Sequence, residues 1–308
     1  MSALDETLAA EAAVARRRPS ALRRMGSSVG VIAGGAILAL MLLVALLAPA
    51  LGTVNPSAID PSARNRAPNA EIATRQADGT RVQRTAWMGT DSLGRDVYSR
   101  VIYGARVSLA VGVTAASISV AIGLLIGLVA GYVRWVDGIA MRAMDGVMAI
   151  PNILLAIALV SLWGASLLTV IVAVAVPEIP RVVRLVRSLV LSIREEPYVE
   201  AAVALGTPVP LVLWRHVMPN TVAPLIVQAT FICANAILVE AILSFLGIGI
   251  PPEIPTWGNI MAEGRALFRV YPHNILFPGI YLSLTVLAIN IIGDGLRDTL
   301  DPRMMKRV

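Results

Sequence analysis

Long apolar stretches alternate with shorter polar ones along almost the whole chain. Six apolar stretches predict membrane-spanning helices, because about 20 mostly apolar residues in helical form cross the hydrocarbon core of a bilayer. The predicted spans cover residues 29–51, 105–133, 143–163, 167–190, 221–248 and 274–293. The pattern therefore predicts an all-α membrane protein with six transmembrane helices, in which a first span precedes a five-helix core over residues 105–293.

The polar stretches give the orientation of these spans. Five arginines crowd residues 1–28 just before the first span, which marks this tail as cytoplasmic by the positive-inside rule. Six spans then place the loops 52–104 and 249–273 outside the cell, and residues 192–220 and the tail 294–308 in the cytoplasm. The first loop also holds arginines, but long loops follow the charge rule poorly. These are Arg64, Arg66, Arg75, Arg81 and Arg84.

The first span has one feature of a cleavable signal peptide. Ala48-Pro49-Ala50 resembles a signal-peptidase site, and the basic residues before the span fit a signal sequence. The apolar run of residues 29–51 is longer than the roughly 7–15 residues of a typical signal-peptide core. We therefore expect a retained first transmembrane helix.

The first external loop changes character along its length. Its early part contains three prolines, which predict irregular structure. Near its end, Asp91 can cap a short helix whose apolar side carries Val97, Val101 and Ile102. We expect this helix to lie along the membrane surface, separate from the second span.

Two spans carry residues that predict how they pack. Gly123, Gly127 and Gly131 recur every fourth residue of the second span, a spacing that lets another helix approach closely. Pro177 and Pro180 predict a kink in the fourth span.

Three arginines follow that kink at intervals of three residues. Arg181, Arg184 and Arg187 could form a voltage-sensor stripe. The alternative that we favour is a helix that extends into the cytosol, where the arginines reach lipid headgroups or an acidic partner. The stripe runs directly into the polar 192–220 segment, which supports this alternative.

The 192–220 segment is predicted to be a helix-turn-helix. Ser192 and Glu195 have the spacing of a capping box, and Pro197 suits the first turn of a helix. Gly206 stands where a helix end often needs a positive φ. Pro208 then prevents the first helix from continuing and allows a second one to start.

Composition supports a membrane protein without an ATPase site. Of 308 residues, 56% are hydrophobic, and the net charge of +6 reflects arginines beside the spans, so no nucleic-acid partner is expected. The sole lysine, Lys306, lies in the C-terminal tail. A nucleotide-binding Walker A loop needs Gly-Lys before Ser or Thr, so ATP hydrolysis would have to come from another chain.

Several polar side chains fall inside apolar sequence. Gln228, Asn235 and Glu240 lie in the fifth span and are candidates for lining a translocation path, although helix-packing roles are the alternative. Glu178 is expected to pair with a nearby arginine. Cys233 is expected to be a small buried side chain. The two histidines are predicted on opposite sides of the membrane, so no metal site is expected.

Within the 192–220 segment, Glu200-Ala201-Ala202, then Gly206, then Val217-Met218-Pro219 resemble the EAA loop of ATP-binding-cassette importer permeases. Met218 replaces the usual leucine. In that family the loop forms a cytoplasmic coupling helix that docks in a groove of the ATPase subunit. The resemblance implies a set of coupling residues, although an ordinary amphipathic connector is the alternative. They are Glu196, Tyr198, Glu200, Ala201, Ala202, Leu205, Gly206 and Pro219.

A second match lies at the end of the first external loop. Gly89-Thr90-Asp91 and Gly94-Arg95-Asp96 resemble a signature of the permeases of dipeptide, oligopeptide and nickel importers. The resemblance implies a multi-pass protein of the prokaryotic inner (cytoplasmic) membrane that acts with a second permease, two ATPase subunits or domains and an external solute-binding protein. It implies no cofactor in this chain, since ATP and Mg would be bound by the ATPases.

Two other classes of function are open to discrimination. A self-sufficient secondary transporter or channel would favour internal repeats and deep charges, and the chain shows no convincing repeat. A membrane enzyme would need a catalytic constellation, which the sequence does not display. The substrate is not fixed by the sequence, because similar permeases handle dipeptides, oligopeptides and nickel chelates.

Overall fold

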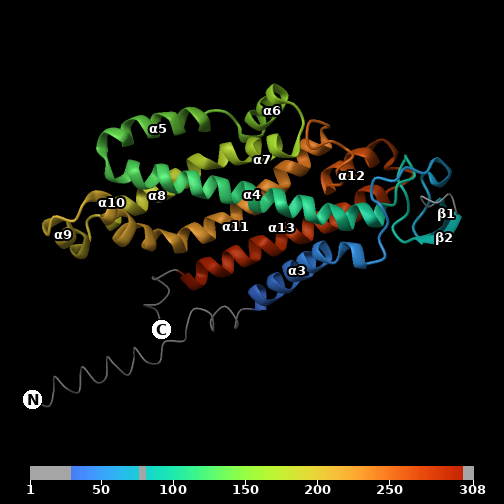
Figure 1. The fold of residues 1–308 in the computed structure, drawn as a ribbon, viewed down its shortest axis with the longest axis horizontal. Coiled ribbons are helices and arrows are strands. Elements are labelled where there is room, and N and C mark those ends of the chain that lie inside the picture. The colour runs from blue at the N-terminus through green and yellow to red at the C-terminus, as the bar shows by residue number, and fades with distance from the viewer. Residues whose placement is uncertain (1–28, 76–80, 301–308) are drawn as a thin grey trace, which may run out of the picture.

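The computed structural model describes residues 29–75 and 81–300, and four long helices dominate it (Figure 1). They are α3 (Val29–Leu46), α4 (Val97–Tyr132), α11 (Met218–Phe245) and α13 (His273–Leu300). In the bundle α11 packs between α4 and α13, and α3 packs on α13 and α4. The predictions for the tail 1–28 and for residues 301–308 fall outside the described residues.

Shorter elements complete the bundle. The helices are α5 (Arg134–Met148), α6 (Asn152–Trp163), α7 (Leu167–Ala175), α8 (Ile179–Ile193), α9 (Pro197–Ala204), α10 (Val209–Val212) and α12 (Trp257–Gly264). Short 3₁₀ turns occur at Ala48–Ala50, Pro61–Ala63, Val176–Glu178 and Arg265–Leu267, and a π-helical segment covers Leu213–Val217. In Figure 1, α9 and α10 lie at one end of the bundle and the β-strands lie at the opposite end.

In the described residues, four helices are long and apolar enough to cross a membrane, or five if a bent pair counts as one span. The bent pair is α5 and α6, which meet at 88° around Pro151. The third predicted span is therefore broken rather than straight. The fourth, 167–190, is divided between α7 and α8 by the turn Val176–Glu178, where Pro177 and Pro180 were expected to produce a kink. The described helices support a membrane protein of several spans without fixing their number at six.

The predicted loop 52–104 differs from the prediction in two ways. It contains an antiparallel pair of strands, β1 (Ala70–Arg75) and β2 (Arg81–Ala86), with Ala70 opposite Ala86. The short surface helix predicted before residue 104 is absent as a separate element, because one helix runs unbroken from Val97 to Tyr132. Its N-cap is Asp96, which accepts from the backbone N–H of Ser99 at 2.8 Å, and not Asp91. No residue after Asp96 breaks the helix, so it continues directly into the span.

The predicted close approach at the three glycines of α4 is confirmed. A Cβ added at Gly123, Gly127 or Gly131 would lie 2.5–2.6 Å from the Cβ of Val182, Val186 or Val190 of α8, respectively. These valines are fully buried. The glycines therefore allow the backbone of α4 to lie directly against the valine ridge of α8.

Candidate functional site

The first half of the 192–220 segment is a short helix with well-defined ends. α9 starts at Pro197 and follows an extended residue, Glu196, as the proline predicts. It ends in a Schellman motif, in which the N–H of Thr207 donates to the Ala202 carbonyl and that of Gly206 to the Val203 carbonyl. Gly206 has a φ of +80°, so the predicted left-handed glycine is confirmed.

The predicted capping box is wrong. Ser192 lies in the last turn of α8, and its carbonyl, not its hydroxyl, accepts from the N–H of Glu195 at 3.3 Å. Helix α8 outlasts the prediction because Val190 is buried against α4 and holds the final turn in place.

The second half of the segment is continuous with a span. Pro208 precedes α10, and α10 passes through the π-helical segment Leu213–Val217 into α11 without a break. Pro219 was expected to close the segment, but it occupies the first turn of α11. Proline has no N–H to give to a residue four positions back, and here the N–H of Met218 bonds to the Leu213 carbonyl five back. The wider π-helical turn accommodates Pro219 without a break between α10 and α11.

One face of α9 is buried and the other is exposed. Val199 and Ala202 pack inward, and Val199 joins an apolar cluster with residues of α8, α10 and α11. Tyr198 and Leu205 are exposed, Leu205 to 87%. The predicted coupling residues Glu196, Glu200, Ala201 and Pro219 are exposed as well.

Side-chain contacts to two long helices, α11 and α4, hold α9 and the residues beside it in place. The Tyr198 hydroxyl accepts from the Asn220 side-chain amide at 3.2 Å, which links α9 to α11. On the other side, Arg194 donates to the Gly131 carbonyl at the end of α4 at 3.4 Å. A hollow beside α9 is lined by Tyr132, Arg194, Glu195, Glu200, Val203 and Ala204. The exposed helix is thus mounted on the ends of α4, α8 and α11.

Each arginine of the stripe on α8 has an acidic partner within the chain. Arg184 pairs with Asp145 of α5 at 2.5 Å, and Arg187 binds Asp137 of the same helix through two hydrogen bonds. Arg181 pairs with Glu178 at 3.2 Å, which confirms the pairing predicted for Glu178. Two of the three arginines of the stripe therefore pair with acidic residues of α5.

The three polar residues predicted to line a path have different surroundings. Asn235 donates to Glu178 at 2.7 Å, so it ties α11 to the turn before α8. Glu240 is fully buried and accepts from the Ser244 hydroxyl at 2.8 Å. Gln228 is half-buried on α11. Asn235 and Glu240 therefore bind different neighbours.

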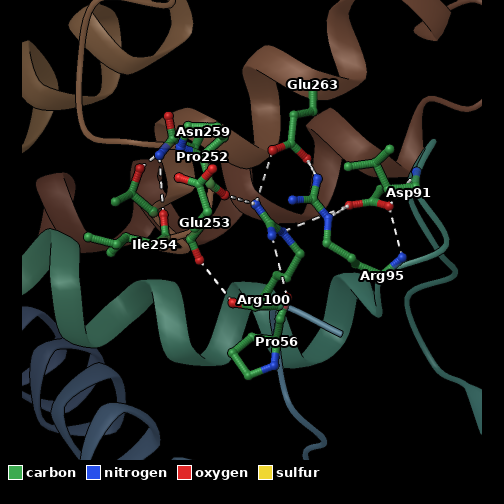
Figure 2. Close-up of polar contacts among 12 residues, drawn as sticks. Pro56, Asp91, Arg95, Arg100, Pro252, Glu253, Ile254, Asn259 and Glu263 are labelled. Atoms are coloured by element: carbon green, nitrogen blue, oxygen red, sulfur yellow. Dashed lines mark hydrogen bonds and ion pairs between the residues drawn. The ribbon is translucent and has the colours of Figure 1, made fainter. Parts of the chain in front are cut away.

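Sequence reasoning did not foresee a second polar site, which we call the external cluster: Asp91, Arg95, Arg100 and Glu263. Arg95 binds Asp91 at 2.7 Å and also Glu263, and Arg100 binds Glu263 at 3.2 Å (Figure 2). Burial raises the pKa of the Glu263 carboxyl to about 7, although the Arg100 and Arg95 guanidinium groups oppose the rise. The signal in the sequence was Gly89-Thr90-Asp91 and Gly94-Arg95-Asp96, whose charges turn inward.

The glycines of that sequence are required by the chain around them. Gly89 and Gly94 have φ values of +78° and +79°. A Cβ at Gly94 would collide with the Asp60 carbonyl oxygen, and one at Gly89 with the Arg66 carbonyl oxygen. The Thr90 hydroxyl donates to the Ala63 carbonyl. The motif therefore pins the 60–66 region against the start of α4.

In the described part of the chain, no group of three or more His, Cys, Asp or Glu side chains could hold a metal ion. His216 lies in the π-helical segment near α9, and His273 begins α13. Cys233 is partly buried between apolar residues of the bundle.

Comparison with known proteins identifies the chain's relatives. A probable peptide ABC transporter permease, y4tQ of Sinorhizobium fredii, is 51% identical over 90% of each chain. The dipeptide transport system permease DppC of Alkalihalophilus pseudofirmus is 40% identical over 92% of this chain and 89% of its own. The glutathione transport system permease GsiD of Pectobacterium atrosepticum is 43% identical over 71% of this chain and 73% of its own. Residues 120–306 match the family described as binding-protein-dependent transport system inner membrane component, and the chain belongs to that family.

Proposed function

We propose that this chain is a permease subunit of an ATP-driven importer that carries peptides across the inner membrane. The names of its relatives support peptides as cargo, since they include peptide, dipeptide and glutathione permeases. In this proposal a second, homologous permease completes the path, two ATPase subunits or domains bind ATP and Mg, and an external binding protein delivers the peptide.

The proposed topology has six spans and both termini in the cytoplasm. The spans are α3, α4, the bent pair α5–α6, the pair α7–α8, the rod α10–α11, and α13. Their positions in Figure 1 support the arrangement, because α9 lies at the end of the bundle opposite the strands β1 and β2. With β1–β2 external, α9 is cytoplasmic.

The main observation behind the proposed function is that α9 has an exposed face at the end of the bundle and a buried face that packs on the long helices. Leu205 and Trp214 are 87% and 68% exposed at the end of the bundle, where a monomer gains nothing from them. Val199 is buried against α8, α10 and α11, and α8 and α11 belong to the proposed spans. A force applied to the exposed face of α9 would therefore move α8 and α11. We propose that closure of the ATPases moves α9 and that these helices open and shut the path.

Of the predicted path residues, we propose Gln228, which is half-buried on α11, as the one that faces the path in this conformation. Asn235 is engaged with Glu178, and Glu240 is enclosed within the bundle. In our proposal these two residues reach the path only in a state in which α11 has moved away from its neighbours.

Co-purification and reconstitution test the proposal. The chain is expressed with its genomic neighbours, and ATPase activity and peptide uptake are measured in proteoliposomes. We expect uptake to require ATP, the ATPase chains and the binding protein. Peptide uptake by this chain alone, driven by an ion gradient, would show a secondary transporter instead.

A further inference from the structure

We propose that Glu263 is a positioning residue that locks α12 to the external end of α4, so that α12, α4 and residues 52–75 and 81–96 move as one body during transport. The inference rests on the proposed function, since transport supplies the motion. It goes beyond that function because it assigns a role to the external cluster, at the end of the molecule opposite α9.

Glu263 is the contribution of α12 to the external cluster. Its two carboxylate oxygens are divided between two arginines, with Oε2 facing Arg95 and Oε1 facing Arg100 (Figure 2). Arg100 belongs to the first turn of α4, and Arg95 lies just before it. One side chain thus bridges α12 to two positions at the start of α4.

The charge balance makes this bridge hard to break. Asp91, Arg95 and Arg100 are all but completely buried, whereas the side chain of Glu263 is 19% exposed. If α12 moved away, the two guanidinium groups would be left with the single carboxylate of Asp91. A buried ion pair that loses one partner is strongly destabilised, because the remaining charge stays out of water without compensation.

Backbone carbonyls hold the Arg100 side chain in place. Arg100 donates to the Pro56 carbonyl at 3.4 Å and to the Pro252 carbonyl at 3.3 Å. The loop that carries Pro252 is itself tied down by Asn259, whose side-chain amide donates to the carbonyls of Ile250, Pro251 and Ile254 (Figure 2). The carbonyls of Pro56 and Pro252 therefore hold the Arg100 guanidinium in addition to Glu263.

Helix α12 packs less extensively on α4 than on its other two neighbours. Helix α12 packs mainly on α11 and α13, and Gly258 lies directly against Ala241 of α11. Toward α4 its main apolar contact is the buried Trp257, whose indole N–H donates to the Val101 carbonyl at 3.1 Å. In our proposal Glu263 adds an ionic link to these contacts, and this link makes α4 follow α12 as it moves.

The test measures the distance between α12 and α4 by spin labels. Cysteines replace the exposed Ala110 of α4 and Ala266, which follows α12, in a Cys233→Ser background. Labelled complexes with the ATPase chains are placed in nanodiscs at pH 8, where the Glu263 carboxylate is ionised. Distance distributions by pulsed electron paramagnetic resonance are compared without nucleotide and with ATP bound to hydrolysis-deficient ATPase chains.

We expect one narrow distance, the same in both states, in the otherwise unchanged chain. Glu263→Gln should broaden the distribution and shift it to longer distances, and Glu263→Asp, which keeps the charge, should recover most of the narrow peak. Glu253→Gln is the matched control, because Glu253 is an exposed acid of the neighbouring loop and should leave the distribution unchanged.

Two results would overturn the proposal: a distance that changes between the two nucleotide states, or a Glu263→Gln distribution that matches the control. If Glu263→Gln is not recovered from membranes, the two-state comparison still decides. If the chain assembles with no ATPase, the proposed function fails, yet the Gln and Asp variants in the isolated chain still test the lock.

Discussion

Replacing Gly127 by alanine tests how α4 and α8 are joined. An added Cβ would lie 2.6 Å from the Cβ of Val186 and 3.0 Å from the Val183 carbonyl oxygen, whereas ordinary contact begins at 3.4 Å. The helices would have to separate by about 0.8 Å, the difference between 3.4 and 2.6 Å. Overpacking of this kind costs about 1–3 kcal/mol. We therefore expect Gly127→Ala to lower stability by that amount and to weaken coupling of ATP hydrolysis to transport.

The assay combines thermal unfolding of the purified complex with peptide uptake per ATP hydrolysed. Gly146→Ala is the matched control, because a Cβ at that helical glycine meets no atom within 4 Å. A second substitution, Val186→Gly, removes the Cβ that the new methyl would meet at 2.6 Å, so the double variant should be more stable than the sum of the two single changes predicts. If Gly127→Ala unfolds like Gly146→Ala, or if the double variant is no better than additive, the close packing of α4 on α8 has been misjudged.

Three further outcomes are expected. Gly206→Ala should cost about 1–2 kcal/mol from its positive φ and reduce ATPase coupling, while Gly146→Ala does neither; equal coupling in the two complexes would remove the role of the α9 end. Asn235→Leu should lower stability by about 1–3 kcal/mol because Glu178 loses a donor, as unfolding measurements would show; an unchanged midpoint would contradict this. Burial and the nearby Asp91 raise the pKa of the Glu263 carboxyl to about 7. Lowering the pH from 8 to 6 therefore protonates this carboxyl and weakens its pairing with Arg95 and Arg100. The labelled α12–α4 distance should then broaden at pH 6, but not in Glu263→Gln, which has no such proton to gain.

Features set by local chemistry were predictable from the sequence. The positive φ at Gly206 follows from a glycine after a helix, and the close approach of α4 and α8 follows from glycines every fourth residue. The pairing of Glu178 with an arginine was predictable because a carboxylate in apolar sequence needs a partner.

Features set by tertiary packing were not. Whether Ser192 ends one helix or starts the next depends on the burial of Val190 against α4, which no local pattern reports. Which face of α9 is buried was not predictable from its pattern, because Tyr198 and Leu205 are apolar yet exposed. The external cluster was missed because Glu263 lies far along the chain from Arg95 and Arg100.

Accessibility of the α9 tip tests the central claim most directly. A cysteine is placed at Leu205 in a Cys233→Ser background and treated with a membrane-impermeant maleimide in intact and in permeabilised cells. We predict labelling only after permeabilisation, and protection of the purified chain when ATPase subunits are added. Labelling of intact cells from the outside, or labelling that the ATPase subunits leave unchanged, would contradict the account.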